Sequence, residues 1–142
     1  MSTFDFYFTR LMYESGDWDV DQRMPSNVLN SLVEYTTLRV DKAERLVNLS
    51  DPKMLEAPFC YLAGHKLVQF TPAERKNFER YVKGGGFVFV DDCNHDIDGL
   101  FAKSFEAELA MVSKPVVSLK KPAATRFFLR QARIACEATS AR

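Results

Sequence analysis

The stretch GGGFVFVDDCNHD, residues 84–96, indicates the fold class of this 142-residue chain. Four consecutive apolar residues, 87–90, are typical of a central strand that is buried on both faces of a parallel sheet. Three glycines end the preceding element, and polar, ionisable residues follow the strand directly. In open α/β sheets, ligands bind at the carboxyl ends of the strands. The stretch therefore predicts both a parallel sheet and a place for a functional site.

Strands and helices are predicted to alternate along the chain. We expect strands at residues 4–11, 45–49, 58–63 and 87–90, and helices at residues 26–37, 71–83 and 97–112. The third strand is continuously apolar and is expected to be central. The eight residues 50–57 that join the second and third strands are fewer than a parallel crossover usually needs. The alternation still predicts a parallel sheet with helices on both faces.

The helix ends carry the clearest local signals. Thr71, Pro72 and Glu74 predict a capping box with proline at the first helical position. Gly84 is expected to form a left-handed cap at the end of that helix. Ser26 is the expected N-cap of the first helix.

The composition bounds the class of protein. A hydrophobic content of 46% and an aromatic content of 13% are typical of a globular domain. We find no apolar run as long as a membrane span and no secretory signal at the N-terminus, so a cytoplasmic location is expected. Cys60, Cys93 and Cys136 lack a C-x-x-C spacing, which argues against a disulfide framework and a structural zinc site.

The charge is unevenly distributed, although the formal net charge is zero. Residues 113–142 contain seven Lys or Arg residues and one acidic residue. We therefore predict an α/β domain over residues 1–112 and a basic tail over residues 113–142 that is aberrant or packs poorly. A basic tail can bind nucleic acid, but this tail has no known binding pattern, so no nucleic-acid partner is expected.

Four stretches within residues 4–110 are similar to a known protein family. They are FTRLMYESGDWDVD (residues 8–21), MPSNVLNSLVEYTT (residues 24–37), the segment from DPKM to CNHD (residues 51–96) and GLFAKSFEAEL (residues 99–109). They resemble the bacterial domain-of-unknown-function family 4159. The resemblance implies a flavodoxin-like three-layer sandwich of the class I glutamine-amidotransferase type, with no established activity. Beyond Met111 the tail does not match, which predicts a sheet truncated at its C-terminus.

The same resemblance implies possible surroundings for the protein. Relatives are often exported or membrane-anchored, so the periplasm is the alternative location. Some are encoded beside MoxR-type ATPases and von Willebrand A-domain proteins. This association implies protein partners in a bacterial envelope complex.

In a flavodoxin-like strand order, the loops after the first, third and fourth strands share the carboxyl edge of the sheet. Both histidines of the chain lie in these loops. We expect one crevice there. The candidate ligand-binding residues are Asp17, Trp18, Asp19, Gly64, His65, Asp91, Asp92, His95 and Asp96, with Asp21, Lys66 and Cys93 beside them.

Two chemistries are open for this crevice. Asp91, Asp92 and His95 are hard or borderline ligands, so they predict a divalent metal that activates water. The alternative is that Asp92 or Asp96 caps the last helix. Cys93 with His65 as its base would be a thiol nucleophile, but the neighbouring acids disfavour a thiolate.

Two further features are weaker. Asp17-x-Asp19-x-Asp21 resembles the start of a calcium loop, but Gln22 and Val28 occupy positions that need glycine and glutamate. Trp18 is expected to act as a lid or an anchor over the crevice.

The function predicted from the sequence is that of a binding or interaction module, because no histidine follows His95 to complete a late catalytic set. A metal-dependent or amidotransferase-like hydrolase is the alternative. The sequence does not indicate which cofactor, if any, the protein binds, nor its oligomeric state.

Overall fold

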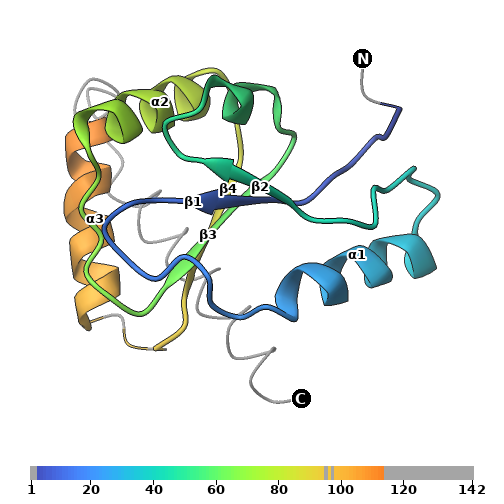
Figure 1. The fold of residues 1–142 in the computed structure, drawn as a ribbon, viewed down its shortest axis with the longest axis horizontal. Coiled ribbons are helices and arrows are strands. Elements are labelled where there is room, and N and C mark those ends of the chain that lie inside the picture. Colours follow the sequence, from blue (N-terminus) through green and yellow to red (C-terminus); the bar gives the residue numbers. More distant parts are fainter. Residues whose placement is uncertain (1–2, 95, 97, 114–142) are drawn as a thin grey trace.

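The computed structural model describes residues 3–94, 96 and 98–113. The predicted alternation is confirmed (Figure 1). The elements are β1 (Thr9–Met12), α1 (Met24–Tyr35), β2 (Arg45–Asn48), the 3₁₀ helix η1 (Pro52–Glu56), β3 (Cys60–Gly64), α2 (Pro72–Lys83), β4 (Val88–Asp92) and α3 (Leu100–Ser113). The tail predicted over residues 113–142 lies outside the described residues, apart from Ser113 at the end of α3.

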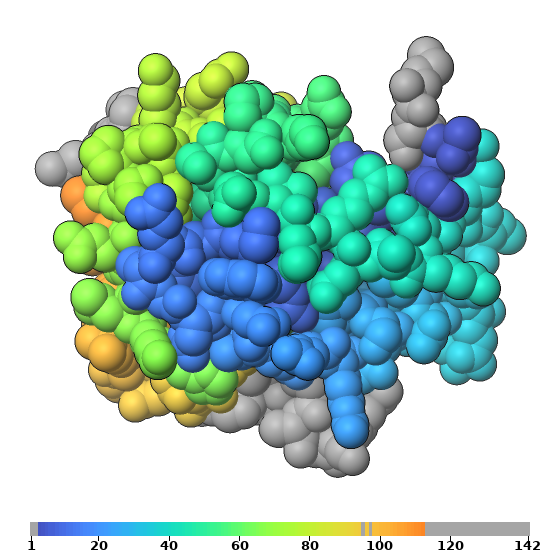
Figure 2. Space-filling view, in the orientation of Figure 1, coloured from blue at the N-terminus to red at the C-terminus, as the bar shows by residue number. Residues whose placement is uncertain are grey.

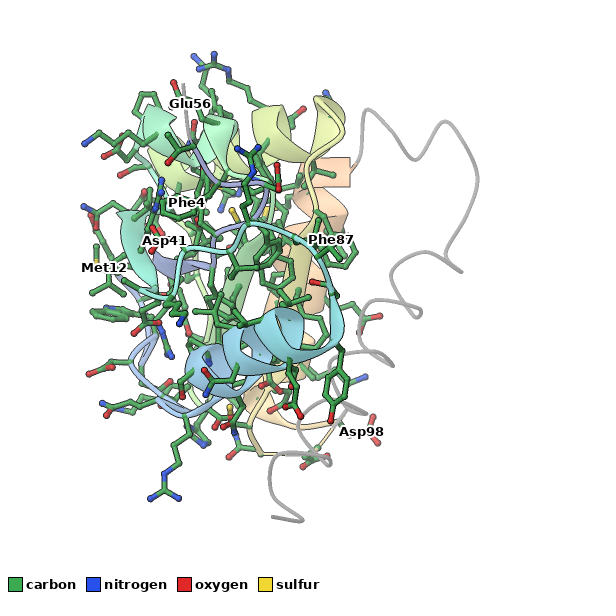
Figure 3. All side chains as sticks on the ribbon, turned by 90° about the vertical axis from the view of Figure 1, so that its right-hand side faces the viewer. Phe4, Met12, Asp41, Glu56, Phe87 and Asp98 are labelled. Carbon is green, nitrogen blue, oxygen red and sulfur yellow. The ribbon has the colours of Figure 1, made fainter. Side chains whose placement is uncertain are left out.

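The described strands form one four-stranded parallel sheet in the order β2-β1-β3-β4. Residues Cys60 to Gly64 of β3 pair with Val88 to Asp92 of β4. Helix α1 covers one face of the sheet, and α2, α3 and η1 cover the other (Figures 1 and 3). This is the three-layer α/β sandwich with a parallel sheet that the sequence predicts.

The short connection from β2 to β3 contains η1 in place of a long crossover helix. The Asp51 carboxylate accepts a hydrogen bond from the backbone N–H of Lys53 and caps η1. The side-chain amide of Asn77 in α2 donates to the carbonyl oxygens of Leu49 (2.8 Å) and Asp51 (2.9 Å). Since these polar groups are satisfied by α2, a single short turn is sufficient to join two strands that lie on either side of β1.

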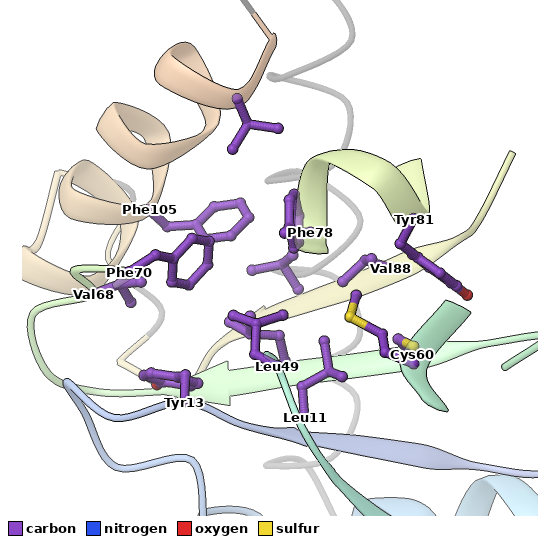
Figure 4. Close-up of a cluster of buried hydrophobic side chains, with 14 of the residues drawn as sticks. Leu11, Tyr13, Leu49, Cys60, Val68, Phe70, Phe78, Tyr81, Val88 and Phe105 are labelled. Carbon is purple, nitrogen blue, oxygen red and sulfur yellow. The ribbon is translucent and has the colours of Figure 1, made fainter. Parts of the chain in front are cut away.

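The larger core lies between the sheet and the α2–α3 layer (Figure 4). Leu62 and Val88 from the sheet are buried in it. The ring of Phe78 packs against Phe70, with centroids 5.5 Å apart, and meets Phe105 edge-on at 6.3 Å. Aromatic contacts of this kind stabilise a core beyond the area that they bury.

The α1 face is covered unevenly. Phe8, just before β1, and Tyr61 of β3 are fully buried beneath α1. On β4, Val88 is buried on the α2–α3 side, but Phe87, just before the strand, is 43% exposed and Phe89 is half-buried. Within the part of the chain that the structure describes, this strand thus lies at the edge of the sheet and is fully covered on one face only, in contrast to the expectation of a central strand buried on both faces. Among the described strands β4 has one neighbour, and β3 is central as predicted.

The N-terminus of α2 has a side-chain cap, whereas that of α1 has none. Helix α1 begins at Met24 rather than after Ser26, and its N-cap Arg23 makes no side-chain capping bond. The Ser26 hydroxyl instead donates to the carbonyl oxygen of Arg23. The capping box of α2 is confirmed, since Thr71 and Glu74 each accept the other's backbone N–H.

The left-handed conformation predicted for Gly84 at the end of α2 occurs at Gly85 instead. Gly84 is the C-cap residue, but its φ of −75° is not left-handed. Gly85, at φ 92°, adopts the left-handed conformation that favours glycine. The helix therefore ends as expected, with the turn one residue later.

Val88→Asp should unfold the domain or destabilise it by about 3–5 kcal/mol, because it places an unpaired charge in the α2–α3 core. Urea unfolding followed by circular dichroism measures the effect. Leu46→Asp is the matched control, since Leu46 is 50% exposed on β2, and it should cost at most about 1 kcal/mol. A Val88→Asp protein as stable as the control would contradict the assigned orientation of β4.

Candidate functional site

The three loops that follow β1, β3 and β4 lie side by side at the carboxyl edge of the sheet. The Ser15 hydroxyl accepts a hydrogen bond from the backbone N–H of Gln69 (2.8 Å). The side-chain amide of Asn94 donates to the carbonyl oxygen of His65 (2.7 Å). In Figure 2 the blue loop after β1 borders the light-green loop after β3 on the molecular surface. Side-chain bonds to backbone thus hold the loops in a defined arrangement.

Asp17 joins the loop after β1 to the loop after β3. Its Oδ1 accepts the backbone N–H groups of His65 (2.9 Å) and Lys66 (3.1 Å), and its Oδ2 lies 3.0 Å from Nδ1 of His65. Partial burial opposes ionisation of Asp17, but these hydrogen bonds outweigh it and lower the pKa of the carboxyl below 3.8. Asp17 therefore joins the loop after β1 to the loop after β3 as a carboxylate.

Gly64 allows this close approach. A Cβ atom at Gly64 would lie 2.3 Å from the hydroxyl of Tyr13, 3.0 Å from the ring of Phe101 and 3.1 Å from Oδ1 of Asp17. The Tyr13 hydroxyl donates to the carbonyl oxygen of Ala63 (2.9 Å). Tyr13 and Phe101 belong to the α2–α3 core, so the Asp17–His65 pair lies on that side of the sheet.

A second group of side chains lies on the α1 side. One ligand atom from each of Asp21, Asp91 and Cys93 lies within 4.8 Å of the other two. The hydroxyl of Tyr61 donates to Oδ2 of Asp91 (2.7 Å). Burial, followed by the charge of Asp91, raises the pKa of Tyr61, so the phenol stays protonated and holds the carboxylate. These donors suit a borderline divalent cation.

The backbone of the β1–α1 loop is held by hydrogen bonds from Arg10, whose side chain is fully buried. Its Nη1 donates to the carbonyl oxygens of Trp18 (3.2 Å) and Val20 (2.5 Å), and Nη2 donates to that of Asp21 (3.4 Å). Its Nε donates to the Glu44 carboxylate (3.1 Å). Asp21 has a φ of 53°, which is unusual for a residue other than glycine. Arg10 therefore supports the backbone that carries the Asp21 carboxylate.

The structure divides the predicted crevice into two groups. Successive residues of a strand point to opposite faces, so Asp91 lies on the α1 side and Asp92 on the α2–α3 side. Oδ1 of Asp92 accepts the backbone N–H of Asn94 (3.0 Å). Of the predicted metal ligands, Asp91 is thus separated from Asp92, and His95 lies outside the described residues.

The remaining candidates make local contacts. Trp18 is half-buried and packs against the α2–α3 core rather than lying open over the edge. Asp19 is exposed and accepts a hydrogen bond from the side chain of Gln22 (3.3 Å). The exposed Asp96 accepts the backbone N–H of Asp98 (3.0 Å) in the turn before α3. The alternative prediction for Asp92 and Asp96 was that one of them caps the last helix, but Asp96 binds the amide of Asp98 in the turn and α3 begins only at Leu100.

The sequence reasoning missed Arg10 and Tyr61. One signal for Arg10 was available, since it is the charged residue in the stretch FTRLM, residues 8–12, at the end of the predicted first strand. A guanidinium buried in a strand requires several acceptors nearby. The sequence reasoning also named no residue at the amino edge. A cavity of about 790 Å³ lies there, and it is lined by Thr3, Phe4, Asp5, Tyr7, Arg45, Glu56 and Pro58. Arg45 is paired with Asp41 and lies over the Tyr7 ring.

The family model for the domain of unknown function DUF4159 matches residues 7–128. The chain belongs to this family. The match extends past Met111, so the expectation that the tail falls outside the family is wrong as far as residue 128. A comparison with curated proteins found no match. Within residues 3–94, 96 and 98–113, none of the helices combines the length and the hydropathy of a membrane span.

Asp17→Asn should lower the free energy of unfolding by about 1 kcal/mol at neutral pH, because it removes a carboxylate that accepts bonds from two loop amides, one of them part-buried. The pKa of Asp17 is lowered in the folded state from the ordinary value of 3.8. Its stabilising contribution is therefore present above that value and is lost as the pH falls through the folded pKa. Wild type should lose more stability than the variant as the pH falls below about 5.

Urea unfolding at a series of pH values measures this difference. Asp19→Asn is the matched control in the same loop, and it should change the stability by at most about 0.5 kcal/mol. Parallel stability curves for wild type and Asp17→Asn would show that Asp17 does not hold the loops together.

Proposed function

We propose that this domain is a binding or interaction module of a bacterial envelope-associated complex, and that it binds its partner at the carboxyl edge of the sheet. The observation that carries the proposal is a set of side-chain hydrogen bonds, accepted by Asp17 and Ser15 and donated by Asn94, which holds three loops in one arrangement. A surface that is ordered before binding loses little conformational entropy when the partner arrives.

The exposed side chains at this edge support a protein partner. Leu67, in the loop after β3, is 45% exposed, and Leu100, at the start of α3, is 58% exposed. The charged and exposed residues Lys66, Asp98 and Lys103 lie near them in the chain. Apolar anchors surrounded by polar groups are typical of protein interfaces. The envelope complex is proposed because some relatives are encoded beside MoxR-type ATPases and von Willebrand A-domain proteins. A role in such a complex would place the protein in the periplasm or near the membrane.

A photo-crosslinking residue at position 67 or 100 should capture one specific protein in cells of the source bacterium, and mass spectrometry identifies it. The same residue at position 46, on the exposed side of β2, should not capture that protein. Leu67→Asp and Leu100→Asp should each weaken binding of the purified partner at least tenfold, or by about 1.4 kcal/mol. Leu46→Asp should leave the affinity unchanged.

Crosslinking from position 46 to the same protein, without crosslinking from positions 67 and 100, would overturn the proposed binding surface. Cell fractionation of the tagged protein tests the location independently. Recovery with cytoplasmic proteins alone would contradict the envelope association.

A metal-dependent hydrolase is a second candidate function, and the Asp21, Asp91 and Cys93 group favours it. Two carboxylates and a thiolate are ligands for Zn²⁺ or another borderline cation. Such an ion would lower the pKa of a bound water and supply hydroxide at neutral pH. Arg10 and Tyr61 would support this group by holding the backbone of Asp21 and the carboxylate of Asp91.

Zn²⁺ should raise the thermal midpoint of the wild-type protein and bind with a stoichiometry of one in calorimetry, because a ligand of the folded state stabilises it. Asp21→Asn should abolish both effects. Glu34→Gln, on the exposed surface of α1, is the control and should bind as wild type does. Equal binding by wild type and Asp21→Asn would exclude this group as a metal site.

A further inference from the structure

Asp17 holds His65 in one ring orientation. The carboxylate accepts two backbone N–H groups at Oδ1 and faces Nδ1 of His65 at 3.0 Å with Oδ2. An ionised carboxylate accepts hydrogen bonds and donates none. The neutral imidazole therefore carries its proton on Nδ1, and its lone pair is on Nε2.

The His65 side chain remains partly accessible to solvent. The His65 side chain is 41% exposed, compared with 22% for Asp17. The loop itself is held by Asn94, which donates to the His65 carbonyl oxygen. Nε2 is thus the ring nitrogen that does not face Asp17, in a side chain that is partly open to solvent at the edge where ligands of α/β sheets bind.

We propose that His65 is a general base at this edge, that Asp17 is its positioning residue, and that the pair promotes hydrolysis of a small carboxylic ester by water. This inference goes beyond the binding role proposed above. An oriented carboxylate–imidazole pair is the arrangement that activates nucleophiles in acyl transfer.

The proton balance of this reaction is closed. The oxygen of water forms a bond to the ester carbonyl carbon while its proton passes to Nε2, and Asp17 stabilises the imidazolium. When the tetrahedral intermediate collapses, its bond to the leaving oxygen breaks and Nε2 returns the proton to that oxygen. The net reaction converts ester and water into carboxylic acid and alcohol, with no other reactant.

The surroundings favour water as the nucleophile and an ester as the substrate. The sulfur of Cys93 lies with Asp21 and Asp91, whose charges disfavour a thiolate. Phosphoryl transfer depends on cations that neutralise several oxygens. The candidate cation group, however, lies on the α1 side of the sheet, whereas the Asp17–His65 pair lies on the α2–α3 side.

The first test is the tautomer of His65 in the full-length protein. Long-range ¹H–¹⁵N spectra above the titration range distinguish Nδ1–H from Nε2–H, and His95→Gln serves only to assign the two sets of ring signals. We expect the Nδ1–H form for His65. Asp17→Asn should weaken this preference, because an amide can donate to Nδ1 as well as accept from it.

The second test is hydrolysis of p-nitrophenyl acetate by the full-length protein. Wild type should exceed His65→Gln at least tenfold, with a rate that rises with pH and falls in D₂O. Asp17→Asn should lie between them. Lys42→Gln, at an exposed position before β2, should equal wild type. Circular dichroism and urea unfolding should show that His65→Gln is folded, because the backbone N–H groups of the loop are unchanged.

An Nε2–H tautomer, or equal hydrolysis by wild type and His65→Gln, would overturn the proposal. These outcomes are independent of the crosslinking result. Loss of partner capture at Leu67 and Leu100 with intact hydrolysis would reject the binding role and leave the acid–base pair in place.

Discussion

The buried guanidinium of Arg10 is the interaction on which the carboxyl edge depends. A charge inside a sheet is stable only when acceptors surround it, and three carbonyl groups of the β1–α1 loop together with Glu44 supply them. The loop must fold back over the end of β1 to bring those carbonyls to Arg10. That path determines where the carboxylates of Asp17 and Asp21 can lie.

The two carboxylates then serve opposite sides of the sheet. Asp17 reaches the loop after β3, where it binds two amides and the His65 ring. Asp21 reaches the end of β4, where Asp91 and Cys93 lie. One buried cation thus supports an oriented histidine on the α2–α3 side and a potential cation site on the α1 side. The division follows from the alternation of side chains along β3 and β4, because Gly64 faces Tyr13 and Phe101 whereas Asp91 faces Tyr61.

The two faces of the sheet also differ in packing. The α2–α3 layer covers β1, β3 and β4 with a continuous aromatic core. Helix α1 covers mainly β1 and β3, so Phe87 is partly exposed although its neighbour Val88 is buried. The same apolar run can therefore lie in a strand that is covered on one face and only partly covered on the other.

Features that depend on local chemistry could be predicted from residue type and spacing. The capping box at Thr71 and Glu74, the alternation of strands and helices and the central place of β3 all follow from residue type and spacing. The sequence also indicated that the loops after β1, β3 and β4 lie together, because the carboxyl ends of parallel strands meet at one edge. Only the tertiary structure decided which residues of those loops meet. Arg10 and Tyr61 act through partners distant in the chain, and whether Asp91 lies with Asp92 or with Asp21 depends on the faces of β4. Such choices depend on contacts across the sheet, which spacing along one segment does not encode.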